Sequence, residues 1–126
     1  EMSTAVQYRL PIKIFILNNE YMGMVRQWQE LLHEKNYSES YTAALPDFVK
    51  LAEAYGCVGI QATKPDELDE KINEMINTKE PVIFDCRVDP AENCFPMIPS
   101  GKPHNQMLLG PEDEKEEVSD EGKTLV

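Results

Sequence analysis

This sequence is poor in the residues that build metal centres, disulfide frameworks and membrane spans. It has three cysteines, Cys57, Cys86 and Cys94, without a C-x-x-C pair, and only two histidines. That supply excludes a zinc site of ordinary spacing and a disulfide framework. No apolar run approaches the roughly 20 residues that cross a bilayer. We also expect no signal peptide, and therefore a cytoplasmic protein with reduced thiols.

Basic residues are also scarce. The chain has 12 lysines and arginines against 23 acidic residues, a net charge of −11. Such a chain repels phosphate backbones and anionic membranes, so we expect neither nucleic acid nor a membrane as a partner. Much of the excess lies between Glu112 and Glu121, and we expect residues 110–126 to form a disordered acidic tail. At 126 residues the chain is one domain or a piece of one.

The first half of the chain alternates helical and strand patterns. Residues 1–8 suit the last turns of a helix, which Pro11 ends. Residues 12–17 are apolar nearly throughout, which indicates a strand buried on both faces in a parallel sheet. Further helices are expected over 23–33 and 47–55 and from Thr63, a possible N-cap, onward, with strands over 58–62 and 82–88. The inward stripes predicted for these helices are Met24, Val25, Trp28, Leu31 and Leu32; Phe48, Leu51, Ala52 and Tyr55; and Leu68, Ile72, Met75 and Ile76.

This order of elements predicts an α/β fold with a doubly wound parallel sheet. Three strands leave exposed edges, so we expect further strands upstream and a domain that is truncated at its N-terminus. Residues 1–88 would be the C-terminal part of that domain. Residues 34–44 are polar and read as a loop. Residues 89–109 are too apolar for a free tail, and we expect an extended segment that covers a surface or a site.

Two asparagines, Asn18 and Asn19, end the first strand, where open α/β sheets bind ligands. Their carboxamide oxygens could bind a hard cation such as Mg²⁺, or phosphate. A magnesium site needs a carboxylate as well, and Glu20 points the other way on an extended chain. The alternative is an Asn-capped turn between strand and helix. The residues alone leave both interpretations open.

Several longer stretches resemble one enzyme family. They are EMSTAVQY at 1–8, PIKIFILNN at 11–19, GMVRQW at 23–28, DFVKLAEA at 47–54 and PMIPSG at 96–101. In this order they are similar to the large catalytic subunit of acetohydroxyacid synthase, also called acetolactate synthase. The resemblance extends to Leu109 and implies the diphosphate-binding domain of a thiamine diphosphate enzyme.

The resemblance implies half of a cofactor site. The family's cofactor motif begins with Gly-Asp and ends with Asn-Asn, so its aspartate would lie upstream of Glu1. Asn19 would bind Mg²⁺ through its side chain and Tyr21 through its backbone carbonyl. Met22 and Gly23 would lie against thiamine diphosphate.

The resemblance also implies a substrate channel. Met24 and Trp28 are one helical turn apart and share a face. As ordinary helix residues they would belong to the core, whereas in the family these positions line the channel. There the tryptophan favours 2-oxobutyrate over pyruvate as second substrate. Ser100 and Gly101 match a second channel-lining stretch.

The implied reaction decarboxylates pyruvate and condenses the two-carbon unit with pyruvate or 2-oxobutyrate, in branched-chain amino acid biosynthesis. No residue of this chain is implied to be catalytic, because the family's general base and its FAD-binding domain lie elsewhere. We therefore expect the chain to be inactive alone. The family forms homodimers or homotetramers, with a possible regulatory small subunit. The alternatives are a non-catalytic α/β binding module and another thiamine diphosphate enzyme, such as a 2-oxo acid decarboxylase or glyoxylate carboligase.

Overall fold

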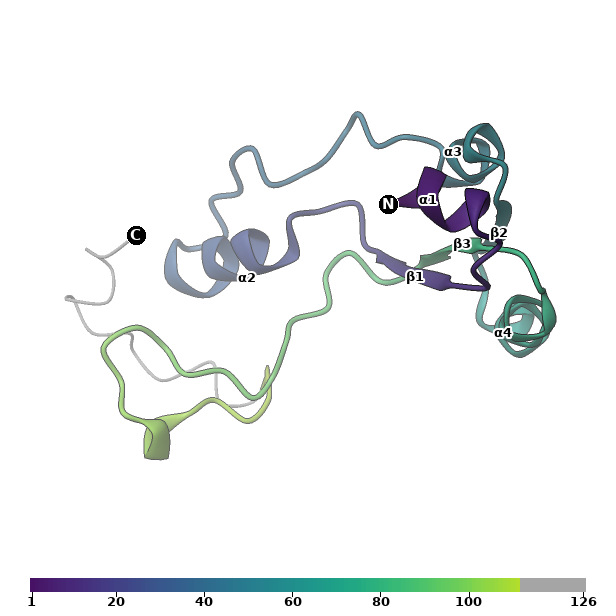
Figure 1. Cartoon of the computed structure of the whole chain (residues 1–126). Coiled ribbons are helices and arrows are strands. Elements are labelled where there is room, and N and C mark those ends of the chain that lie inside the picture. Colours follow the sequence, from purple (N-terminus) through teal and green to yellow (C-terminus); the bar gives the residue numbers. More distant parts are fainter. Residues whose placement is uncertain (112–126) are drawn as a thin grey trace. The chain divides into compact units, whose positions relative to one another are not determined.

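The computed structural model describes residues 1–111 (Figure 1). The acidic tail predicted for residues 110–126 therefore lies almost wholly outside the described residues. The chain divides into two compact units. The first consists of Glu1–Glu20 and Ala43–Asp89, and the second of Tyr21–Thr42 with the described residues from Pro90 onward.

The first unit is built on a three-stranded parallel sheet. Its strand order is β1-β3-β2, so the last strand in sequence is central. Phe84 pairs with Phe15 of β1 on one side and with Ile60 of β2 on the other. The elements of this unit are α1 (Met2–Gln7), β1 (Lys13–Asn18), α3 (Phe48–Tyr55), β2 (Val58–Ala62), the 3₁₀ turn η1 (Pro65–Glu67), α4 (Leu68–Asn77) and β3 (Val82–Arg87).

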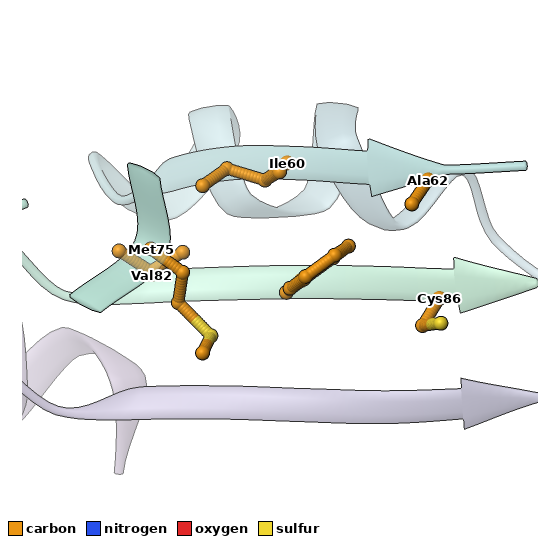
Figure 2. Close-up of a cluster of buried hydrophobic side chains, with 6 residues drawn as sticks. Ile60, Ala62, Met75, Val82 and Cys86 are labelled. Carbon is orange, nitrogen blue, oxygen red and sulfur yellow. The ribbon is translucent and has the colours of Figure 1, made fainter. Parts of the chain in front are cut away.

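Helices cover both faces of this sheet. On one face Ile83 packs with Ala52 of α3, and residues of α1 and β1 join this cluster. On the other face the buried cluster combines β2 and β3 with Met75 of α4 (Figure 2). Ile60 and Ala62 project from β2 to this same cluster. Because side chains alternate along each strand, the sheet contributes to a hydrophobic cluster on each of its faces. The predicted doubly wound α/β fold is therefore confirmed.

Local sequence signals explain most element ends. The side chain of Asp47 accepts a hydrogen bond from the Lys50 N–H at 3.0 Å and caps α3. Gly56 ends α3 in the left-handed conformation, with φ of 78°. The N-cap predicted at Thr63 is wrong, because α4 begins later, at Leu68, after the turn η1. The Thr63 N–H instead donates to the Glu67 carboxylate at 3.2 Å.

Three predictions of burial in this unit are also wrong. Strand β1 is not buried on both faces, since Phe15 is 38% and Leu17 69% exposed. The reason is that β1 lies at the edge of the described sheet, whereas β3 at its centre is buried from Val82 to Cys86. Tyr55 and Ile76, predicted to point inward, are exposed in the last turns of α3 and α4.

The second unit contains α2 (Gly23–Leu32), a loop, and an extended segment with the 3₁₀ turn η2 (His104–Gln106). Antiparallel bridges join Tyr21 to Tyr41 and Met97 to Leu108. The apolar stripe predicted for α2 is partly wrong. Met24 and Val25 are exposed, and the buried residues of the helix are Arg26, Gln27 and Leu32. No helix within residues 1–111 is long and apolar enough to cross a membrane.

Candidate functional site

Polar side chains gather at the carboxyl end of the parallel sheet. The three strands end at Asn18, Ala62 and Arg87. Asp85 on the central strand lies in register with Ile16 and Gln61. Because side chains alternate along a strand, Asn18 lies on the same face as Ile16, and Gln61 on the face opposite Ile60 and Ala62. The sequence thus places an amide on each side of one carboxylate.

Asp85 is the centre of this polar group. It is only 1% exposed. Its Oδ1 accepts a hydrogen bond from Asn18 Nδ2 at 2.8 Å, and its Oδ2 accepts one from Gln61 Nε2 at 2.9 Å. The Nε of Arg87 lies 3.3 Å from Oδ2. A buried carboxylate is stable only when it is paired and hydrogen-bonded, and these three donors meet that requirement.

Asn18 also shapes the turn that follows β1. Its Oδ1 accepts a hydrogen bond from the Glu20 N–H at 3.1 Å, and its backbone carbonyl accepts one from the Val88 N–H at 3.2 Å. Asn18 therefore forms the Asn-capped turn that the sequence left open as one interpretation. Both ends of its buried carboxamide are engaged in the fold.

Glu20 adopts a backbone conformation that non-glycine residues rarely take. Its φ is 61°, in the left-handed region, which costs an L-residue roughly 1–2 kcal/mol. Two contacts hold it there: the N–H bond to Asn18 and an ion pair between its carboxylate and Arg87. Arg87 thus links Glu20 to Asp85. The contacts at the end of β1 form a closed polar ring, whose members are Asn18, Asp85, Arg87 and Glu20. Asn19, the predicted metal ligand, lies between the two residues that the ring fixes, and it is partly buried.

The predicted cofactor residues form one continuous segment of chain. Asn19 belongs to the first unit, whose first stretch ends at Glu20, and Tyr21, Met22 and Gly23 belong to the second. The Met22 N–H donates to the carbonyl of Ser40 at 2.8 Å, and the rings of Tyr21 and Tyr41 lie 5.2 Å apart. Ser40 is 2% exposed, so the loop gives this segment a buried support.

The N-terminus of α2 could bind an anion. The helix begins at Gly23 after Met22, without a side-chain cap and without an acidic residue in its first turn. The first backbone N–H groups of a helix carry partial positive charge and commonly bind phosphate groups.

Buried polar residues of α2 hold the extended segment that follows residue 89. The Arg26 guanidinium donates to the Ala91 carbonyl at 2.9 Å and also bonds Asn93 and Glu30. Gln27 pairs with both backbone groups of Cys94. Partial burial raises the pKa of Glu30, but its contacts with Arg26, Tyr37 and Asn93 outweigh this, and the pKa is lowered.

The predicted channel residues all belong to the second unit. Met24 is 52% exposed and is not a core residue, whereas Trp28 is half-buried. Ser100 and Gly101 lie in a turn that the Lys102 N–H closes onto the Pro99 carbonyl at 3.1 Å, with Gly101 at φ of 79°. The hydrogen bonds of Arg26 and Gln27, including one from Gln27 Nε2 to Met97 Sδ at 2.9 Å, reach residues 91–97, just before this turn.

The three cysteines differ in exposure. Cys57 and Cys86 are buried and Cys94 is exposed, and all three are free thiols. Burial raises the pKa of Cys57, and burial together with the charge of Asp85 raises that of Cys86. Over residues 1–111, no three His, Cys, Asp or Glu side chains gather in a way that could hold a metal ion.

Comparison with known proteins defines the class of this chain. Residues 1–86 match the family model described as thiamine pyrophosphate enzyme, C-terminal TPP binding domain. The chain belongs to this family. The match ends at Cys86, so it covers α1 to α4, β1 and β2, and all of β3 except Arg87.

Two individual relatives of this chain carry a more specific name than the family. The chain is 49% identical over 109 residues to the acetolactate synthase large subunit of Cyanidium caldarium, covering 86% of this chain and 19% of that one. It is 45% identical over 116 residues to the acetolactate synthase large subunit of Haemophilus influenzae, covering 91% and 20%. The chain thus spans about a fifth of the length of these curated relatives.

A solved structure supports the fold. The thiamine diphosphate-dependent 4-hydroxybenzoylformate decarboxylase of Rhodococcus jostii RHA1 superposes with a TM-score of 0.64 at 26% sequence identity. The superposition covers 73% of this chain and 17% of that enzyme. The arrangement of elements seen here is therefore that of part of a thiamine diphosphate enzyme.

Proposed function

We propose that this chain is the C-terminal part of an acetolactate synthase catalytic subunit. The observation that carries the proposal is identity of 49% and 45% to two acetolactate synthase large subunits, over 86% and 91% of the chain. The enzyme would decarboxylate pyruvate and join the two-carbon unit to pyruvate or 2-oxobutyrate, in the biosynthesis of valine, leucine and isoleucine. Thiamine diphosphate, when bound, supplies the electron sink for this chemistry.

A 2-oxo acid decarboxylase is the second candidate. It is favoured by the structural likeness to the Rhodococcus decarboxylase, but at 26% identity against 45–49% for the synthases. Decarboxylases and synthases of this class both remove CO₂ from a 2-oxo acid and differ in the fate of the unit that remains, which for pyruvate has two carbons. The product released therefore distinguishes them. A glyoxylate carboligase and a non-catalytic module are further outcomes that the same test would reveal.

In this proposal the segment after β1 holds the cofactor's charged end. The side-chain oxygen of Asn19 and the backbone carbonyl of Tyr21 would bind Mg²⁺, and Met22 and Gly23 would lie against the cofactor. These donors fit, because Mg²⁺ takes oxygen ligands and shares them with phosphate groups. The uncapped start of α2 fits the anionic diphosphate. Two neutral oxygens make only part of a magnesium site, so a carboxylate would have to come from outside the described residues.

Residues of the second unit would select the second substrate. Met24 and Trp28 on α2, with Ser100 and Gly101 after the extended segment, would line the channel. The exposure of Met24 supports this role over a core role. The bonds from Arg26 and Gln27 would hold residues 89–109 as a covering segment beside α2.

The remaining assignments concern the whole enzyme. The proposal includes FAD bound by another domain, a homodimer or homotetramer of complete subunits, and a regulatory small subunit. It also includes the division into 1–88, 89–109 and an acidic 110–126. A cytoplasmic location stays a prediction from the sequence.

A chimera tests this proposal. Residues 1–109 would replace the matched segment of the Haemophilus influenzae large subunit, in a bacterial host without acetolactate synthase. We expect growth without valine, leucine and isoleucine, and loss of growth when the chimera carries Asn19→Ala. A soluble, folded chimera that makes no acetolactate from pyruvate would contradict the proposal.

A further inference from the structure

The polar ring at the end of β1 contains none of the residues that we propose to bind the cofactor. Asp85 and Asn18 are 1% and 5% exposed and lie in the fold rather than in the predicted cofactor segment. A buried carboxylate in the central strand of a small sheet is otherwise unfavourable, and apolar residues would fill this position more simply. Packing alone therefore does not explain why this position holds a carboxylate.

The contacts of the ring converge on one turn of the chain. Asp85 fixes the amide of Asn18 through its Nδ2, and the opposite end of that amide accepts from the Glu20 N–H. On its other side Asp85 contacts Arg87, and Arg87 pairs with the Glu20 carboxylate. Glu20 is thus held by both its backbone and its side chain, in a left-handed conformation that it would otherwise disfavour.

The residue that this turn orients is Asn19. It stands between Asn18, which the ring fixes, and Glu20, whose φ of 61° lies in the left-handed region. Ligands of a metal are commonly oriented by partners that do not touch the metal, and loss of such a partner weakens metal affinity by roughly 10–100-fold. The geometry here matches that arrangement, with Asp85 as the buried anchor.

We propose that Asp85 is a positioning residue for the Mg²⁺–diphosphate site, acting through Asn18 and Arg87 on the turn that carries Asn19. The inference rests on the proposed function, since it assumes that Asn19 binds the metal. It assigns Asp85 no contact with cofactor or substrate. Gln61, which donates to the other carboxylate oxygen, completes the support.

The test uses the full-length subunit that contains this chain, and calorimetric titration with thiamine diphosphate at fixed Mg²⁺. Asp85→Asn and Asn18→Asp each break the match between amide and carboxylate, because they place two amides or two carboxylates together. We expect each to raise the Kd by roughly 10–100-fold. The double variant exchanges the two groups and restores a donor opposite an acceptor, so it should recover most of the affinity. Activity at saturating cofactor should recover as well, since no reacting group is lost.

Two comparisons separate positioning from general stability. Val82→Ala removes buried volume from the same strand, at its opposite end, and should lower the melting temperature without raising the Kd. Glu20→Gln removes the negative charge that pairs with Arg87 at a partly exposed position, so it should fold and raise the Kd by a smaller factor. An equal rise in Kd for Val82→Ala and Asp85→Asn at equal loss of melting temperature would overturn the inference.

Asn19→Ala separates failure of the positioning role of Asp85 from failure of the proposed metal ligand. If Asn19→Ala raises the Kd and the Asp85 and Asn18 variants do not, the positioning role is refuted and the proposed ligand stands. If Asn19→Ala itself leaves the Kd unchanged, the proposed metal ligand is refuted. A double variant no better than the worse single variant would also refute the pairing of Asn18 with Asp85.

Discussion

The side chain of Gln27 pairs with the backbone of Cys94 in both directions. Gln27 Nε2 donates to the Cys94 carbonyl at 3.1 Å, and the Cys94 N–H donates to Gln27 Oε1 at 2.7 Å. One amide thereby bonds both backbone groups of Cys94, as a neighbouring strand would. Gln27 is 1% exposed, whereas Cys94 is exposed, so both bonds are partly buried. In the second unit this pair fixes the segment that we propose to cover the site.

Loss of this pair should loosen the covering segment. Gln27→Met keeps the length of the side chain but leaves the Cys94 N–H without its partner. We expect a loss of about 0.5–1.5 kcal/mol in the free energy of unfolding for each hydrogen bond removed. Hydrogen exchange at the Cys94 amide should become much faster. Gln7→Met on the exposed face of α1 is the control, and equal effects of both variants would argue against the pair.

Gly59 marks the closest approach of β2 to α3. A Cβ at this position would lie 2.8 Å from both the Cα and the carbonyl oxygen of Val49. Because backbone atoms cannot give way, Gly59→Ala should push helix and strand apart and cost about 1–3 kcal/mol in the free energy of unfolding. Gly110→Ala is the matched control, since no atom lies within 4 Å of its Cβ. Chemical denaturation measures both, and a stable Gly59→Ala variant would show that the sheet and α3 are less tightly packed.

Because of Glu30, the free energy of unfolding should decrease as the pH becomes acidic. Its pKa is lowered from the ordinary value of 4.5, so folding favours the charged form. That contribution is complete above pH 4.5 and is lost as the pH falls through the lower pKa of the folded state. Glu30→Gln should therefore destabilise the protein at pH 7 and destabilise it less at lower pH. Unfolding curves from pH 7 downward check this, with Glu53→Gln on α3 as a control for the loss of one negative charge.

Trp28 should set the choice of second substrate. Trp28→Leu removes a broad apolar wall from the proposed channel, and an extra methylene in such a pocket is worth roughly 1–3 kcal/mol of discrimination. We expect the full-length enzyme to make less 2-aceto-2-hydroxybutyrate relative to 2-acetolactate from a mixture of pyruvate and 2-oxobutyrate. Tyr8→Leu, an exposed aromatic on the first unit, should leave the ratio unchanged. An unaltered ratio for Trp28→Leu would remove Trp28 from the channel.

Much of the fold follows from the sequence because its signals are local. The strand expected over 58–62 is observed with those bounds, and Gly56 and Asp47 delimit α3 as their chemistry suggests. Exposure was harder to predict, because it depends on where a strand lies in the sheet. An apolar run indicated a strand buried on both faces for β1, but the central position belongs to β3, which comes last in the chain.

Part of the candidate site could not be predicted from the sequence pattern. The resemblance identified Asn19 and Trp28, but Asp85, Arg26 and Gln27 were missed, because a polar residue in an apolar pattern is usually assigned to the surface. For Asp85 a usable signal was present. A carboxylate inside the buried strand Val82–Arg87 has to find donors, and Asn18 and Gln61 end or nearly end the strands beside it. For Gln27 no comparable signal exists, since its partner is a backbone group of a segment without periodicity.

Product analysis with the full-length subunit that contains this chain tests most directly whether the enzyme is an acetolactate synthase. Purified enzyme would be incubated with pyruvate, thiamine diphosphate and Mg²⁺, and 2-acetolactate and acetaldehyde would be quantified together. We predict 2-acetolactate as the main product, and its loss in the Asn19→Ala variant at limiting Mg²⁺. Release of acetaldehyde without 2-acetolactate by a folded, cofactor-bound enzyme would contradict the assignment and identify a decarboxylase instead.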